Sequence, residues 1–281
     1  MKFIVVGYLG QYGSMGQWVV DGLRQIGHEV EAYDRNERIP VKKGVYFFVD
    51  CSEDFTANIP EIKYPKVCWL MDSHMPGGLD RGCNLARKCE LVISSNYEHG
   101  AKLLELNGIE SYLVPITYRE EYFKPIEKKY DVVMIGNANS QERIRLWEVL
   151  KGYNSYCGRI EDLETYSEVM SSAKIVINQP TEPWDIILNN RFFEAMGSNS
   201  LLLQKRLQTS LIEKLGFENG RQFIYWNRLS DLPTQLDAVL KDYDSYKDII
   251  ESGYLKVKKY EMKEQLLKIE SLILSKFYDS L

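Results

Sequence analysis

The feature that most constrains the fold is an alternation of short apolar runs with longer amphipathic stretches, which continues along the 281-residue chain. Runs rich in Val, Ile, Leu and Phe are typical of strands that are buried on both faces of a parallel sheet, with helices between them. The alternation therefore predicts an α/β protein whose parallel sheets are covered on both faces. In the first half of the chain we expect strands at Phe3–Val6, Val30–Tyr33, Val45–Phe48, Val67–Leu70, Leu91–Ser94 and Tyr112–Val114.

The same alternation starts again after Pro125, which is followed by the charged run Glu127-Lys128-Lys129 that we interpret as a linker. A chain of this length suggests two domains of about 100 to 150 residues each. We therefore expect two Rossmann-like domains, at residues 1–125 and 126–258, and a C-terminal helix at 259–281 that packs back across them. In the second domain we expect strands at Asp131–Gly136, Tyr153–Tyr156 and Ile175–Ile177, and helices around Arg143–Leu150 and Leu163–Met170.

Composition and charge exclude several classes of protein. The net charge of −5 and the pI near 5.5 argue against broad electrostatic binding to nucleic acid, although a small basic pocket stays compatible with them. Five cysteines, an odd number without paired metal-ligand spacing, indicate a reduced, cytoplasmic protein. No segment approaches the roughly 20 apolar residues of a membrane span, and the apolar start at residues 3–6 is too short for a signal peptide.

The strongest functional candidate is the segment from Lys174 to Leu203, which reads as strand, irregular loop, short helix, turn and strand. Glu194 lies on the helix among apolar neighbours, so its carboxylate needs a hydrogen-bonding partner. Ligands bind at the carboxyl ends of parallel strands, and the amides of a helix start attract phosphate. The segment therefore predicts a nucleotide with its ribose diol on Glu194. The alternative is an ion pair between Glu194 and Arg191, three residues earlier on the same helix face.

The run Arg191-Phe192-Phe193-Glu194, followed by Gly197 and an apolar strand, resembles the donor-site signature of GT-B glycosyltransferases. More specifically, it resembles the group-1-like family that includes CgeB-type spore-maturation proteins. Segments that match the order of elements in that family's two domains are Trp69–His74, Cys89–Ser94, Leu113–Pro115 and Tyr130–Gly136 with Arg143 downstream. In one departure, Ile186 stands where better-known retaining relatives carry a first glutamate.

The resemblance implies two Rossmann-like domains facing each other across a cleft, in which a sugar moves from a nucleotide-diphosphate sugar to an acceptor. A UDP-sugar is the favoured donor, and GT-B enzymes usually need neither a bound metal nor a cofactor. Arg143 and Arg191 would stabilise the negative charge that develops on the leaving group. Gly136 and Asn137 would let the backbone approach the phosphates closely. The full set of candidate nucleotide-binding residues is Gly136, Asn137, Arg143, Gly158, Asn190, Arg191 and Glu194.

In the first domain, Asp72 and His74 follow a predicted strand, so we expect them to point into the cleft. Asp72 is the candidate base if the reaction inverts the sugar, and His74 would contact the sugar or the acceptor. The alternative is a structural loop pair in which Asp72 caps the following turn. A second candidate loop, expected to seat the acceptor or a donor phosphate, consists of Gly10, Gln11, Tyr12 and Gly13. The acceptor stays open among a glycan, a small molecule, a protein and a modified nucleic-acid base, and so does the oligomeric state.

Two other functions compete with glycosyl transfer. Residues 4–16, followed by Asp34-Arg35, resemble the cofactor site of NADP-linked hydroxyacid dehydrogenases. The spacing of Gly10, Gly13 and Gly16 differs from that of the Gly-x-Gly-x-x-Gly motif, and the second α/β pattern after residue 125 favours the transferase. A non-catalytic nucleotide-sugar or glycan-binding protein with the same fold is the other alternative, which the departure at Ile186 keeps open.

Overall fold

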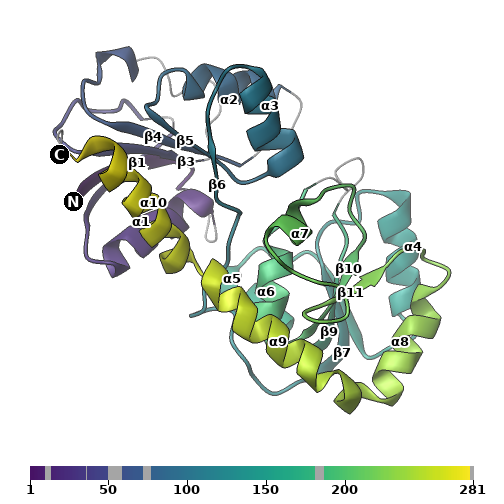
Figure 1. Cartoon of the computed structure of the whole chain (residues 1–281). Coiled ribbons are helices and arrows are strands. Elements are labelled where there is room, and N and C mark those ends of the chain that lie inside the picture. Colours follow the sequence, from purple (N-terminus) through teal and green to yellow (C-terminus); the bar gives the residue numbers. More distant parts are fainter. Residues whose placement is uncertain (10–13, 36, 50–58, 72–76, 181–186, 279–281) are drawn as a thin grey trace. The chain divides into compact units, whose positions relative to one another are not determined.

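A computed structural model describes residues 1–9, 14–35, 37–49, 59–71, 77–180 and 187–278 (Figure 1). The chain divides into two compact units. Unit 1 comprises residues 1–116 together with 262–281, and unit 2 comprises residues 117–261. Each unit is built around a parallel sheet, which confirms the predicted α/β class with two Rossmann-like domains.

The described residues of unit 1 form a six-stranded parallel sheet with the order β2-β1-β3-β4-β5-β6. One face of this sheet, which includes Ile4, Tyr46 and Cys68, packs against Leu85 and Leu104 of two flanking helices. The strands are β1 (Lys2–Gly7), β2 (Glu29–Asp34), β3 (Val45–Val49), β4 (Lys66–Leu70), β5 (Leu91–Ser94) and β6 (Tyr112–Leu113). The helices are α1 (Met15–Gln25), α2 (Gly78–Ala86), α3 (Lys102–Leu106) and α10 (Met262–Phe277), with a 3₁₀ turn at Ile59–Glu61 and a π-helical turn at Tyr97–Ala101.

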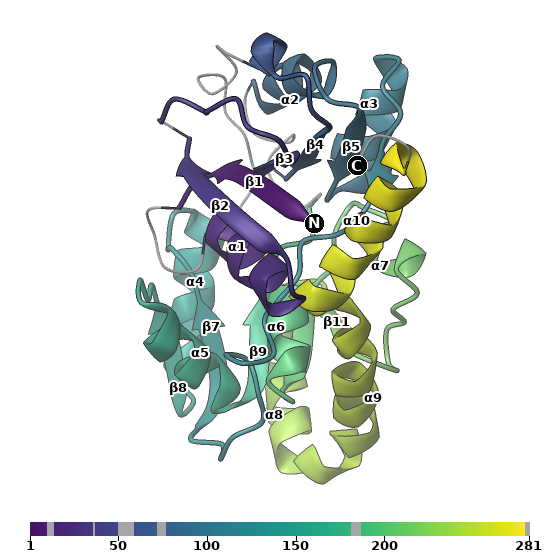
Figure 2. The same cartoon turned by 90° about the vertical axis from the view of Figure 1, so that its left-hand side faces the viewer.

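The last helix, α10, packs against α1 within unit 1 (Figure 2). The two helices approach closely at Gly22, where an added Cβ would lie 2.5 Å from Cδ1 of Leu266. His28, the residue just before β2, contacts α10, because its Nε2 lies 3.2 Å from Oε1 of Glu270. Unit 1 therefore contains residues from the first and the last parts of the chain, which pack against each other.

In unit 2 the part of the chain that the structure describes forms a five-stranded parallel sheet with the order β11-β10-β9-β7-β8. In both sheets the first strand of the unit lies between the second and the third, which creates a switch point in the strand order. The strands are β7 (Tyr130–Ile135), β8 (Ser155–Gly158), β9 (Ala173–Asn178), β10 (Leu201–Lys205) and β11 (Ile224–Trp226). The helices are α4 (Gln141–Leu150), α5 (Leu163–Ser171), α6 (Arg191–Gly197), α7 (Leu211–Lys214), α8 (Leu232–Lys241) and α9 (Lys247–Val257), with 3₁₀ turns at Tyr243–Tyr246 and Lys258–Tyr260.

The division between the units falls after residue 116, before the boundary at 125 that we predicted. The reason is that residues 117 and 118 pack onto unit 2. Thr117 donates a hydrogen bond from Oγ1 to the carbonyl oxygen of Tyr260, and the Tyr118 ring lies against Gly197, where an added Cβ would lie 2.4 Å from Cε2. The domain boundaries at 125 and 258 stay a sequence-based prediction, while the contacts divide the chain after residue 116 and before residue 262.

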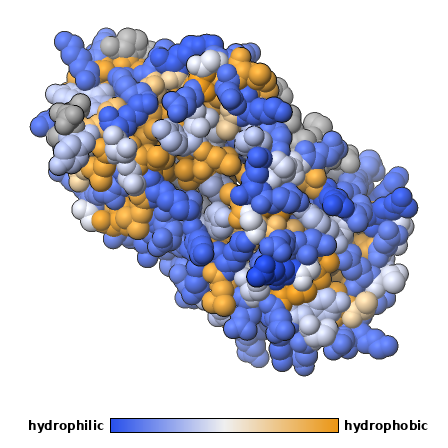
Figure 3. All heavy atoms as spheres, viewed as in Figure 1, coloured by the Kyte–Doolittle hydropathy of each residue, from blue (hydrophilic) through white to orange (hydrophobic). Residues whose placement is uncertain are grey.

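Polar and charged side chains cover most of the face seen in Figure 3, and apolar side chains gather there in separate patches. Large exposed apolar residues include Leu267, Leu274 and Tyr278 near the end of the chain. Within the described ranges, no helix has the length and apolar character needed to cross a membrane.

Candidate functional site

A pocket of about 360 Å³ lies in unit 2 where the strand order switches between β7 and β9. In open α/β sheets this is the place where ligands bind, at the carboxyl ends of the strands. Its lining comes from the segments after β7, β8 and β9 and from three helices: Ile135, Gly136, Asn137, Arg143, Arg159, Ile160, Tyr166, Pro180, Ile187, Asn189 and Arg191. The pocket thus brings together Gly136, Asn137, Arg143 and Arg191, which the sequence had singled out.

Arg143 lies in the first turn of α4, which starts at the capping residue Ser140. Its side chain folds back over the end of β7. Nη1 donates to the carbonyl oxygen of Asn137 at 2.8 Å, and Nη2 donates to the carbonyl oxygen of Gln179. Arg143 is only 4% exposed, and its Nε has no hydrogen-bond partner among the described residues. Burial, together with the nearby charge of Arg191, lowers the pKa of Arg143 to about 10.

The carboxylate next to Arg143 in the sequence does not neutralise it. Glu142 pairs instead with Lys205, at 2.6 Å between Nζ and Oε1, and accepts a hydrogen bond from Nε2 of Gln179 at 2.7 Å. None of the ion pairs found among the described residues involves Arg143 or Arg191. A buried positive charge without an anionic partner is costly, so the buried Arg143, with the half-buried Arg191 beside the same pocket, indicates a site for an anionic ligand.

Gly136 follows β7 and has a φ of 150°, a conformation that side chains rarely adopt. An added Cβ would lie 3.0 Å from Nη1 of Arg143, so the glycine makes room for this guanidinium. The Gly136 amide donates to the carbonyl oxygen of Gly158 at 2.9 Å, which ties the ends of β7 and β8 together. Gly136 therefore shapes the pocket through Arg143, and Gly158 supports it without being one of its lining residues.

Glu194 lies on α6 and is only 3% exposed. The hydroxyl of Tyr166 on α5 donates a hydrogen bond to Oε2 of Glu194. Burial raises the pKa of Glu194 to about 7, even though the Tyr166 hydrogen bond and the charge of Arg191 both lower it. The alternative prediction, an ion pair with Arg191, is not found among the pairs of the described residues. Glu194 therefore lies behind Tyr166, which itself lines the pocket.

The loop before α6 is held to the sheet by side-chain amides. Asn178, the last residue of β9, donates from Nδ2 to Oδ1 of Asn189 at 2.9 Å and to Oε1 of Gln204 at 2.8 Å. Asn189 returns a hydrogen bond to Oδ1 of Asn178 at 3.2 Å. The predicted residue Asn190 has a backbone role, because its carbonyl oxygen accepts from the amides of Phe193 and Glu194, both at 2.9 Å. Asn189, rather than Asn190, lines the pocket.

Tyr166, Arg159 and Ile160 also line the pocket, but they were not among the residues predicted from the sequence. Arg159 and Ile160 directly follow β8, so the rule that ligands bind at the carboxyl ends of parallel strands was a usable signal for both. Tyr166 lies within a helix that was predicted correctly, but no local pattern relates it to Glu194.

The candidate residues of unit 1 lie outside the described residues: Asp72, His74, Gly10, Gln11, Tyr12 and Gly13. Ile186 also lies outside them. The chain just before Asp72 is anchored, because the carbonyl oxygen of Met71 accepts hydrogen bonds from Oγ of Ser95 at 3.3 Å and from Nδ2 of Asn96 at 3.0 Å. Residue 72 therefore follows a segment that is fixed at the carboxyl end of β4.

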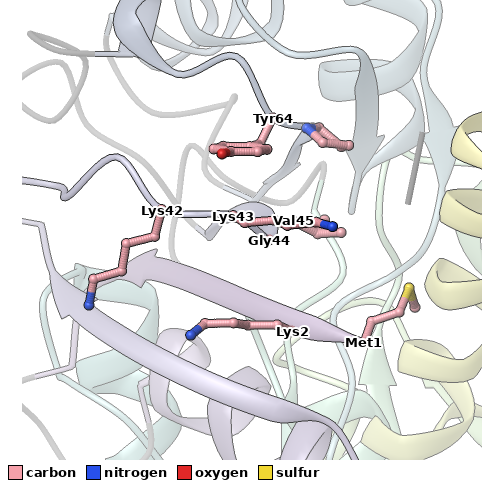
Figure 4. A pocket seen from close by; sticks show the side chains of 8 residues that line it. Met1, Lys2, Lys42, Lys43, Gly44, Val45 and Tyr64 are labelled. Atoms are coloured by element: carbon pink, nitrogen blue, oxygen red, sulfur yellow. The ribbon is translucent and has the colours of Figure 1, made fainter.

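A second cavity, of about 480 Å³, lies in unit 1 at the amino ends of the strands β1 and β3 (Figure 4). Lys2 and Lys42 line it, and both pair with Glu31, at 2.7 and 2.6 Å. Because two of its lysine charges are already paired with a carboxylate, this cavity is a weaker candidate than the pocket in unit 2. Within the described ranges, no group of three or more His, Cys, Asp and Glu side chains is arranged to hold a metal ion.

Known proteins share this architecture. A structure of Alr3699/HepE from Anabaena in complex with UDP and glucose superposes with a TM-score of 0.71 at 11% identity, covering 98% of this chain and 100% of that one. A mutant of T4 phage BGT in complex with UDP-glucose gives a TM-score of 0.66 at 15% identity, covering 98% and 99%. The pneumococcal O-GlcNAc transferase GtfA in complex with UDP and GlcNAc gives 0.56 at 10% identity, covering 82% and 56%.

These likenesses show that the chain has the GT-B glycosyltransferase fold. A comparison with curated proteins found no match. The profile of the family described as glycosyl transferase-like matches residues 119–268. The predicted enzyme class is thus confirmed at the level of family and fold. Because the matched segment makes up more than half of the chain and contains every residue that lines the pocket in unit 2, the chain belongs to the glycosyl transferase-like family.

Proposed function

We propose that this protein transfers a sugar from a nucleoside-diphosphate sugar, with a UDP-sugar as the favoured donor, to an acceptor. The observation that carries the proposal is the pair of guanidinium groups of Arg143 and Arg191 beside the switch-point pocket. The Nε of each is buried and has no hydrogen-bond partner among the described residues. The structures of HepE and T4 phage BGT with UDP or UDP-glucose support this choice of donor.

The chemistry of sugar transfer needs such groups. As the bond to the sugar breaks, negative charge develops on the nucleoside diphosphate, and fixed cationic donors stabilise it most when they are already in place. Arginine binds phosphate oxygens with two parallel hydrogen bonds, which a lysine does not. We therefore assign the diphosphate to Arg143 and Arg191, and we propose that the reaction uses neither a metal ion nor a cofactor.

We propose that Glu194 binds the ribose diol. A carboxylate accepts hydrogen bonds from two adjacent hydroxyls, so the ionised form is the one that binds. Tyr166 donates to Oε2, and we assign the ribose hydroxyls to Oε1, which can accept two hydrogen bonds. With a pKa of about 7, Glu194 is divided between its two protonation states at neutral pH. Nucleotide binding would then draw it towards the ionised state.

In unit 1 we keep Asp72 as the proposed base for an inverting reaction and His74 as a contact to the sugar or acceptor. Both follow β4, and the carboxyl ends of parallel strands are where α/β proteins place such groups. We likewise keep the loop Gly10, Gln11, Tyr12 and Gly13 as the proposed seat of the acceptor or a donor phosphate. The kinship with CgeB-type proteins is also part of this proposal, and the acceptor stays open.

A thermal-shift panel tests the choice of donor. A ligand that binds only the folded protein raises the melting temperature. We expect UDP and one UDP-sugar to do so, and GDP, ADP and NADP to have smaller effects. Stabilisation by NADP alone would instead favour a dehydrogenase. UDP release in the presence of candidate acceptors then tests catalysis.

Variants at residues 72 and 74 separate binding from turnover. We expect Asp72→Asn to lose most UDP release while keeping its UDP affinity, because a base acts in the transition state. We expect His74→Ala also to lower UDP release. Unchanged turnover in both variants contradicts this assignment. Firm binding of a UDP-sugar without turnover under any condition points to a non-catalytic nucleotide-sugar-binding protein.

A further inference from the structure

Lys128 lies in the charged run that we interpreted as a linker, and among the described residues it has no acidic partner. Its ammonium donates three hydrogen bonds: to the carbonyl oxygens of Ser171 at 2.9 Å and Ser198 at 3.0 Å, and to Oγ of Ser200 at 3.0 Å. A lysine ammonium has three N–H donors, so these contacts use all of them. Burial lowers the pKa of Lys128 to about 8. No ion pair found in the described part of the chain includes it, whereas the adjacent Lys129 pairs with Glu168 at 2.7 Å.

Two of the three acceptors of Lys128 lie at the ends of two helices. Ser171 is the last residue of α5, and Ser198 directly follows α6. The last carbonyl groups of a helix lack partners within the helix and carry partial negative charge, so a cation there is stabilising. The Lys128 ammonium thus caps the C-terminal ends of both α5 and α6. The hydroxyls of Ser171 and Ser198 also contact each other, with 3.1 Å between their Oγ atoms.

The same two helices are joined a second time at the pocket. Tyr166 of α5 donates its hydroxyl hydrogen bond to Glu194 of α6. The two connections are linked through the backbone, because the amide of Ser198 donates to the carbonyl oxygen of Glu194 at 2.9 Å. Ser198, the residue whose carbonyl oxygen accepts from Lys128, is therefore one hydrogen bond away from Glu194.

We infer that Lys128 is a positioning residue for the nucleotide site: by holding the ends of α5 and α6 together, it keeps the Tyr166–Glu194 pair enclosed and aligned for the ribose. The identity of the ligand, a nucleotide, rests on the proposed function, whereas the contacts of Lys128 with α5 and α6 do not. Lys128 itself acts from the far ends of the helices and touches no substrate.

The test compares Lys128→Met with Lys129→Met. Methionine keeps most of the side-chain length and removes the charge and the three donors. We expect Lys128→Met to weaken UDP binding by about tenfold, a fold-change within the range of coupling between contacting residues. Lys129→Met removes a neighbouring exposed lysine with a single carboxylate partner, so its UDP affinity should equal that of the wild type.

A second readout needs no ligand. The Glu194 carboxyl can be titrated by NMR in the free protein, where Tyr166 and Arg191 are the titratable and charged groups that act on it. We expect a midpoint near 7 in the wild type and a lower midpoint in Lys128→Met, because parted helices admit water to the carboxylate. If Lys128 only added stability to the fold, Lys128→Met would leave the titration midpoint of Glu194 unchanged.

If Lys128→Met does not fold, Ser200→Ala removes one of the three acceptors and should shift the midpoint in the same direction by less. The inference is overturned if folded Lys128→Met keeps both the wild-type midpoint and the wild-type UDP affinity, or if Lys129→Met matches its effects. A wild type that binds no nucleotide, combined with a shifted midpoint in Lys128→Met, would overturn the proposed function and leave the role of Lys128 intact.

Discussion

Tyr166 on α5 and Glu194 on α6 are 28 residues apart in the chain, yet the hydroxyl of the first donates a hydrogen bond to Oε2 of the second. The bond holds a carboxyl group that is almost fully buried and whose pKa is raised to about 7 by that burial. The protonation state of Glu194 therefore changes near neutral pH.

Glu194→Gln should weaken UDP binding by about tenfold or more, because it replaces a charged acceptor of the ribose hydroxyls by a neutral amide. UDP that lacks both ribose hydroxyls should bind the wild type and the variant equally. Isothermal titration calorimetry measures both ligands. Glu164→Gln, at an exposed position on α5, is the control and should bind UDP like the wild type. Equal loss for both ligands would show that Glu194 does not contact the ribose.

The unliganded protein should lose stability as the pH rises from about 4.5 to about 7. Glu194 has an ordinary pKa of 4.5 and a raised value of about 7 in the folded state, so in this window the folded protein keeps a proton that the unfolded chain has lost. The free energy of unfolding then falls with rising pH, by up to roughly 3 kcal/mol. Urea denaturation of the wild type and Glu194→Gln measures it. The difference between the two proteins should change across the window, and a constant difference would contradict the assignment.

Arg143→Ala should weaken UDP binding by more than about tenfold while leaving the weaker binding of uridine unchanged, because a charged hydrogen bond to phosphate is lost. The control is Arg145→Ala, which removes an exposed arginine from the same helix. Binding titrations with the two ligands separate the phosphate contribution from that of the nucleoside. A parallel loss for uridine would mean that Arg143 only supports the fold of the pocket.

Gly197→Ala should destabilise unit 2 by about 1 to 3 kcal/mol, because overpacking forces side chains or backbone to move. The added Cβ would lie 2.4 Å from Cε2 of the Tyr118 ring. Gly152→Ala is the matched control, since its Cβ would meet nothing closer than 3.6 Å, at the carbonyl oxygen of Val149. Thermal denaturation compares them. If Gly197→Ala is as stable as the control, this glycine of the signature is not needed for packing against Tyr118.

Local sequence patterns predicted most of the fold. The strand expected at Leu91–Ser94 has those bounds, and the one expected at Val45–Phe48 is one residue longer. The alternation of apolar strands and amphipathic helices is encoded within short windows, which is why it is readable without a structure. Glu194 was singled out from its place on a helix after a strand, whereas Arg143 and Arg191 were named through the resemblance to GT-B glycosyltransferases.

The contacts of Lys128 and Tyr166 were not predictable in this way. The three acceptors of Lys128 lie 43, 70 and 72 residues further along the chain. A charge run beside a proline is usually solvated, and nothing within the run tells which lysine turns inward. Tyr166 reaches Glu194 only because β9 and its flanking loops return α6 to the side of α5. Such pairings depend on tertiary packing, which a local pattern does not record.

The packing of α10 on α1 has a consequence for how the chain acquires its fold. Unit 1 needs residues from both sides of unit 2, whereas unit 2 is one continuous segment. During synthesis the surface of α1 around Gly22 stays uncovered until Leu266 has been made. Since domains fold as units while the chain emerges from the ribosome, the unit that is translated second is the first to be complete. We therefore expect unit 2 to complete its fold before unit 1 does.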